Sequence, residues 1–147
     1  MSDDAKAAKE LVETLKDGER GFAEAADKVR DSEHPAWAET LRRLSTQRAG
    51  FHREIVELGH EYGDDVDESG SVAAAVHRGW LSLKDALTGD DAGAVLAAAA
   101  TGEDHAVSEY DKALEMDLSA GFREVVTRQR AAVVVARDEV KALQVAG

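Results

Sequence analysis

The chain has 147 residues, enough for one domain with its own hydrophobic core. Hydrophobic residues make up 44% and charged residues 33%, a globular rather than a disordered composition. Cysteine is absent, which excludes disulfides, thiolate metal sites and thiol catalysis. The net charge of −12 disfavours phosphate backbones and anionic lipid, so we expect neither a nucleic-acid nor a membrane partner.

The N-terminal segment is acidic and leads straight into a polar helix, unlike a signal peptide. No apolar run approaches the roughly 18 residues that a membrane span requires. We therefore expect a single cytoplasmic domain over residues 1–147.

Apolar residues recur every three or four positions through four long segments, and this spacing predicts four long helices. Their expected ranges are 5–31, 35–62, 92–116 and 118–145. A shorter helix is predicted after Ser71, as far as Leu87, with Val72, Val76 and Trp80 on one face.

A helix of 16 residues rises about 24 Å, so the short helix can carry the chain from one end of a bundle to the other. The fold class is therefore predicted to be all-α: a four-helix bundle with one crossover helix between the second and third long helices. Simple hairpin connectivity stays open as an alternative.

Polar residues interrupt three of the long apolar stripes near the helix midpoints: Arg48, Glu103 and Gln129. The first helix places Glu19 beside its own midpoint, and these four side chains are predicted to form one polar layer. A buried charge costs several kcal/mol unless it is paired. Two glutamates against one arginine leave a charge of −1. A protonated glutamate, a second basic side chain (Arg128 or Arg130) or a bound cation would balance it.

Three interpretations of this layer remain open. The layer could be a salt-bridge network that fixes the helix register, an altered cation site, or a set from which one residue turns toward solvent.

Trp37 and Trp80 fall on apolar stripes and are predicted to be core residues. Trp80 is the better interface candidate of the two, because a crossover helix packs on the outside of a bundle.

Four ordered motifs resemble a bacterial family of ferritin-like four-helix-bundle proteins of unestablished function. They are Lys16-Asp17-Gly18-Glu19-Arg20-Gly21-Phe22, Gln47-Arg48, Val76-His77-Arg78-Gly79-Trp80 with Leu83-Lys84, and Gly102-Glu103-Asp104 with Tyr110. The resemblance runs through nearly the whole chain and implies the ferritin-like fold rather than an activity.

Ferritin-like di-iron proteins use one glutamate from each of two helices and a Glu-x-x-His pair from each of two others. Glu19 and Glu103 match the first requirement, but Arg48 and Gln129 stand where the other two helices pass the middle. The one Glu-x-x-His, Glu57 to His60, lies away from the midpoint. The resemblance therefore implies a degenerate di-iron site.

The leading hypothesis is a non-catalytic structural or protein-interaction module with no cofactor and no catalytic residue. The alternative is a metal-binding or oxidative-stress protein with an unusual mid-bundle site for iron, zinc or manganese. Its ligands would be Glu19 and Glu103 with His52 or His105. A small-molecule pocket at the small residues 92–100 is a third hypothesis, and a homodimer stays open.

Overall fold

The computed structural model describes residues 2–61 and 79–146, and every regular element in these ranges is a helix. The all-α fold class is thus confirmed. The four long helices begin and end within two residues of their predicted bounds. The elements are α1 (Asp4–Arg30), α2 (Ala36–Glu61), α4 (Leu81–Thr88), α5 (Ala92–Leu114) and α6 (Ala120–Ala146).

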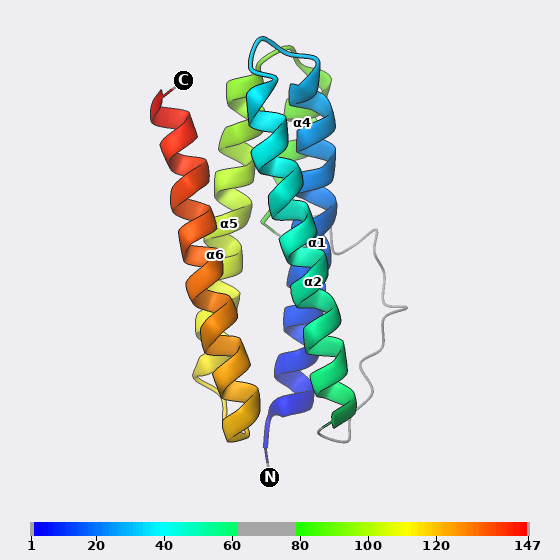
Figure 1. Cartoon of the computed structure of the whole chain (residues 1–147), viewed down its shortest axis with the longest axis vertical. Coiled ribbons are helices and arrows are strands. Elements are labelled where there is room, and N and C mark those ends of the chain that lie inside the picture. The colour runs from blue at the N-terminus through cyan, green and yellow to red at the C-terminus, as the bar shows by residue number, and fades with distance from the viewer. Residues whose placement is uncertain (1, 62–78, 147) are drawn as a thin grey trace.

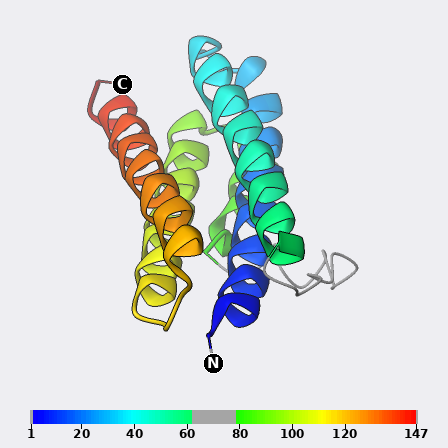
Figure 2. The same cartoon turned by 60° about the horizontal axis from the view of Figure 1, so that its bottom comes forward.

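The long helices form two antiparallel pairs, α1 with α2 and α5 with α6 (Figures 1 and 2). α1 and α6 run in one direction, and α2 and α5 run in the other (Figure 1). α5 therefore starts at the end of the bundle where α2 also starts. This is the predicted one-crossover connectivity, and simple hairpin connectivity is excluded.

The crossover differs from the single helix predicted after Ser71. Ser71, Val72 and Val76 lie outside the described residues. Within them, Gly79 and Trp80 form a turn and α4 begins only at Leu81. Gly79 has φ +72°, and a Cβ atom there would lie 2.5 Å from Cβ of His105. A continuous helix through position 79 was therefore a wrong prediction, because periodicity does not register this break.

The hydrophobic core is divided into two clusters along the bundle axis. One contains Phe22, Trp80 and Leu96 with their neighbours, and the other contains Leu15, Tyr110 and Phe122. The fully buried polar residues Arg48, Glu103 and Gln129 belong to neither cluster and lie near the helix midpoints. The core is therefore polar at mid-height.

The start of α1 is fastened to the turn between α5 and α6. The buried carboxylate of Asp4 accepts hydrogen bonds from the backbone N–H and the hydroxyl of Ser119, the former at 2.8 Å. The Asp3 backbone N–H donates to the Asp117 carbonyl at 2.7 Å. Arg123 donates to the carbonyl oxygens of Leu114 and Met116 at the end of α5. These bonds satisfy helix-terminal groups that the helices leave unpaired.

None of the described helices has the length and apolar character that a membrane span needs.

Candidate functional site

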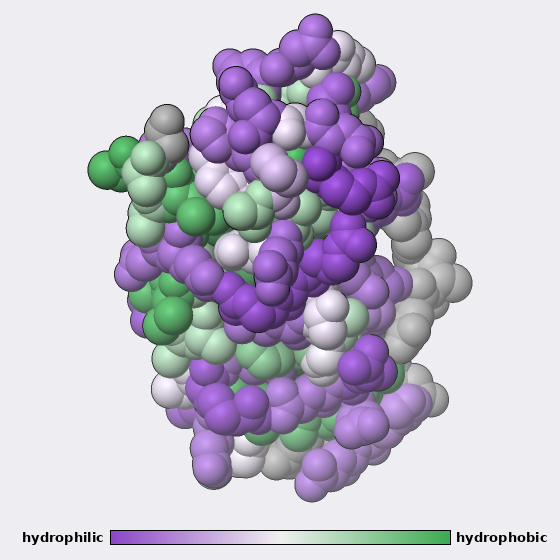
Figure 3. Space-filling view, turned by 45° about the horizontal axis from the view of Figure 1, so that its top comes forward, coloured by the Kyte–Doolittle hydropathy of each residue, from purple (hydrophilic) through white to green (hydrophobic). Residues whose placement is uncertain are grey.

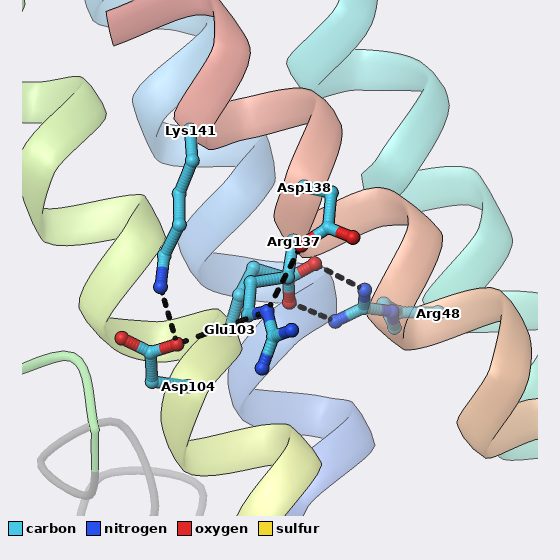
Figure 4. Close-up of polar contacts among 6 residues, drawn as sticks. All are labelled: Arg48, Glu103, Asp104, Arg137, Asp138 and Lys141. Carbon is cyan, nitrogen blue, oxygen red and sulfur yellow. Dashed lines mark hydrogen bonds and ion pairs between the residues drawn. The ribbon is translucent and has the colours of Figure 1, made fainter.

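A buried ion pair joins α2 to α5 at mid-bundle. Nη1 of Arg48 donates to Oε1 of Glu103 at 2.5 Å, and Nη2 donates to Oε2 at 2.6 Å (Figure 4). Arg48 is 1% exposed and Glu103 is 0% exposed. The pair is bidentate and fully desolvated, the geometry in which a guanidinium and a carboxylate interact most strongly.

The space for the Arg48 side chain comes from a glycine on α1. A Cβ atom at Gly18 would lie 3.3 Å from both Cγ and Nη1 of Arg48, so the absent side chain leaves room for the arginine. The guanidinium carbon lies 5.2 Å from the centroid of the Phe22 ring, within cation–π range. Nε donates to the side-chain oxygen of Gln47 at 3.2 Å. Arg48 therefore has an aromatic or polar partner on each side.

Burial and charge act in opposite directions on Glu103. Loss of water raises the pKa of its carboxyl above the ordinary value, and the guanidinium of Arg48 opposes that rise. Arg137 on α6 adds a weaker lowering effect on this pKa. The carboxylate is therefore costly to keep ionised in the core, and Arg48 provides the main compensation.

A second set of charges lies on the surface beside the pair, between α5 and α6 (Figure 4). Lys141 donates to Asp104 at 2.9 Å, and Nε of Arg137 lies 4.0 Å from the same carboxylate oxygen. Arg137 also contacts Asp138 at 3.3 Å. These residues are partly exposed, so each contact adds little stability, but they join α5 and α6 at the level of Glu103.

Gln129 belongs to a separate network. The hydroxyl of Tyr110 donates to Oε1 of Gln129 at 2.7 Å, and Nε2 of Gln129 donates to Oε1 of Glu54 at 2.8 Å. Arg128 pairs with the other oxygen of Glu54 at the surface. Burial raises the pKa of the Tyr110 hydroxyl. This network connects α5, α6 and α2 through hydrogen bonds that do not include Arg48 or Glu103.

Glu19 is placed outside the layer that the sequence suggests. Its side chain is 40% exposed, and Oε2 lies 3.7 Å from Nδ1 of His52. Gly18 occupies the core-facing position, and the next residue on a helix points about 100° away. The structure therefore brings Arg48 and Glu103 together, keeps Gln129 apart and leaves Glu19 at the rim. Within the Arg48–Glu103 pair, one carboxylate faces one guanidinium, so these two charges balance.

The four candidate metal ligands do not form one group, although Glu19 and His52 lie 3.7 Å apart. Both oxygens of Glu103 are bonded to Arg48, while His105 Nε2 lies 3.7 Å from Glu109 on its own helix. Glu57 and His60 are both exposed. Among residues 2–61 and 79–146, no three histidine or acidic side chains are grouped as metal ligands. The guanidinium of Arg48 stands against the carboxylate of Glu103, which is one of the candidate ligands.

The sequence did not predict which side chains form hydrogen bonds with the buried polar residues. Tyr110 and Glu54, which bond Gln129, lie on helices where periodicity gives no sign of hydrogen bonding. The role of Gly18 has a signal, since a glycine on an apolar stripe opposite an arginine marks space for a large side chain. Gly21 and Gly102 give the same signal for Trp80, which is 3% exposed. The core prediction for Trp80 is confirmed, and its expected outward position is wrong.

Comparison with solved structures gives a match in a mutant of Dps1 from Mycobacterium smegmatis. The TM-score is 0.80 at 17% sequence identity, over 97% of this chain and 95% of that chain. This likeness shows that the fold is a ferritin-like four-helix bundle. No curated protein matches the sequence. The family model described as a domain of unknown function, DUF2383, matches residues 4–116, which include α1, α2, α4 and α5. The chain therefore belongs to the DUF2383 family, a ferritin-like helical family of unknown function.

Proposed function

We propose that this chain is a ferritin-like bundle without di-iron chemistry, which serves as a structural or protein-interaction module. The observation that carries the proposal is the bidentate bond of Arg48 to Glu103 in the dry middle of the bundle. A cation held there would have to displace the guanidinium, whose positive charge would then be buried without a partner. The ion pair instead fixes the register of α2 against α5.

An apolar stripe on the outer face of α6 supports an interaction role. Ala131, Val135, Ala142 and Val145 follow one another at steps of three or four residues, or of seven across Asp138, and all are exposed. Val135 is 67% exposed and Val145 is 90% exposed. Apolar surface is gathered on the side of the molecule where α6 ends, while most of the visible face is hydrophilic (Figure 3). Such a patch is typical of protein-contact surfaces.

The metal content of protein purified without chelator tests the first half of the proposal. We expect iron, zinc and manganese far below one ion per chain, and no acceleration of iron oxidation in air. A stoichiometric metal that disappears in Glu103→Gln would overturn it and favour the metal-binding alternative. Glu109→Gln is the matched control on the same helix, because its carboxylate is not bonded to Arg48.

Site-specific photo-cross-linking in cells tests the second half. A photoreactive residue at position 135 or 142 is expected to give a discrete protein adduct. The same residue at position 57, exposed on α2, serves as the control. Equal adduct patterns from α6 and α2 would contradict a role of the α6 face.

A further inference from the structure

The indole of Trp80 fills a slot between two glycines on different helices. A Cβ atom at Gly21 on α1 would lie 2.6 Å from Cε3 of Trp80, and one at Gly102 on α5 would lie 2.2 Å from Cε2. Neither distance is compatible with a side chain of any size. The ring therefore lies directly against the backbones of both helices.

The inner end of the slot reaches the polar layer. The Trp80 ring meets Phe22 edge-on, with centroids 5.1 Å apart and an interplanar angle of 77°. The Phe22 ring also contacts the guanidinium of Arg48, and Gly102 directly precedes Glu103. The slot therefore adjoins the polar layer through the Phe22 ring.

Trp80 directly precedes α4, a short helix that buries few side chains. α4 has eight residues, of which only Leu83 and Ala86 are buried. Trp80 also lines a surface cleft of about 440 Å³, whose other walls include Glu24, Leu81 and Lys84. Short elements with few buried contacts open locally at a lower free energy than the whole domain unfolds. A local opening of α4 would release the indole toward the cleft while the long helices stay packed.

We infer that the slot between Gly21 and Gly102 is a binding site for a planar aromatic molecule of about the size of indole. Trp80 is its resident ligand, and α4 is a plug that such a molecule displaces. The tethered indole competes at an effective concentration on the order of millimolar, so the intact chain binds an external ring weakly. This inference is independent of the role of the α6 face.

Indole itself is the probe, and Trp80→Gly removes the plug while leaving both glycines. We expect this variant to bind one indole per chain, with a rise in melting temperature and NMR shifts at Gly21, Gly102 and Glu103. Adding Gly102→Ala should weaken binding by about tenfold or more, since the methyl group enters the slot. Adding Gly50→Ala is the matched control, because the nearest atom to its Cβ is 3.9 Å away. A folded Trp80→Gly chain that ignores indole, or binds it equally with Gly102→Ala, would overturn the site.

Hydrogen exchange of the unmodified chain tests the plug even if Trp80→Gly does not fold. The α4 amides are expected to exchange through an opening that costs less free energy than global unfolding. Saturating indole should accelerate this exchange. Exchange of α4 only together with α1 and α5, unchanged by indole, would rule out a displaceable plug.

Discussion

Gly18 and Arg48 are complementary in shape: a Cβ atom on the glycine would lie 3.3 Å from two atoms of the arginine side chain. Because two bonds to Glu103 hold the guanidinium, it cannot shift to accommodate a methyl group. Overpacking costs about 1–3 kcal/mol, which outweighs the roughly 1 kcal/mol that alanine gains over glycine in a helix. We expect Gly18→Ala to lower the free energy of unfolding by about 1 kcal/mol.

Gly50→Ala is the control for this substitution. It makes the same chemical change in a helix, with no atom closer than 3.9 Å to the new Cβ. Urea denaturation should show stabilisation of about 0.5–1 kcal/mol. A Gly18→Ala protein as stable as the Gly50→Ala protein would contradict the tight fit.

The Arg48–Glu103 pair is expected to behave as one unit. Arg48→Met leaves a buried carboxylate without its partner, and the expected loss is about 3–5 kcal/mol. The double variant Arg48→Met with Glu103→Leu removes both charges and should recover most of that loss. A double-mutant cycle from urea denaturation measures the coupling. A loss below about 1 kcal/mol in Arg48→Met would mean that water replaces the guanidinium.

The Arg48→Met variant should be more pH-dependent than the parent chain. Burial already raises the pKa of Glu103 above its ordinary 4.5, and removing Arg48 removes the main opposing effect. A carboxyl whose pKa is higher in the folded state binds more protons when folded. Stability is therefore lost as pH rises from 4.5 to the folded pKa. Denaturation at several pH values should show that the deficit of Arg48→Met shrinks on acidification. A deficit independent of pH would contradict this mechanism.

Tyr110 is expected to stay protonated beyond its ordinary range. Burial raises the pKa of its hydroxyl above 10.0, and the hydroxyl donates a hydrogen bond to the side-chain oxygen of Gln129. The folded state therefore loses stability above pH 10, when the unfolded chain ionises and the folded chain does not. In a Tyr62→Phe chain, where Tyr110 is the remaining tyrosine, phenolate absorbance should appear together with unfolding. Ionisation near pH 10 with the fold intact would show that the hydroxyl reaches solvent.

Asp4 is predicted to stabilise the fold as the cap of the α5–α6 turn. Asp4→Ala removes the acceptor of the Ser119 backbone N–H and hydroxyl. We expect a loss of about 1–2 kcal/mol in thermal or urea unfolding. Asp90→Ala removes the same charge from an exposed position and should leave stability nearly unchanged. Equal effects of the two substitutions would assign the loss to charge rather than to capping.

The long helices were predictable because their apolar residues repeat every three or four positions over more than 20 residues. The break at Gly79 was not predictable. Its φ is +72°, and its backbone lies close to His105 on another helix, so a side chain at position 79 would clash there. Local periodicity carries no information about such a contact.

In the site, too, some features were predictable from the sequence and others depend on tertiary contacts. Arg48, Glu103 and Gln129 were visible as polar interruptions of apolar stripes, and all three are buried. Glu19 is a one-position error, because its neighbour Gly18 holds the core-facing position next to the arginine. The pairing of Gln129 with Tyr110 and Glu54 depends on how α5, α6 and α2 are placed around one another. That placement comes from tertiary packing rather than from any single helix.

The mid-bundle pair also has a consequence for how the chain assembles. Its two members are 55 residues apart and belong to different antiparallel hairpins, α1–α2 and α5–α6. Each hairpin forms from contacts that are close in sequence, whereas the ion pair forms only when the hairpins dock. Docking in a shifted register would leave an arginine and a glutamate dehydrated and apart, so the pair selects one alignment at the last step. Substitutions at Arg48 should then accelerate unfolding much more than they slow folding, which chevron kinetics measure directly.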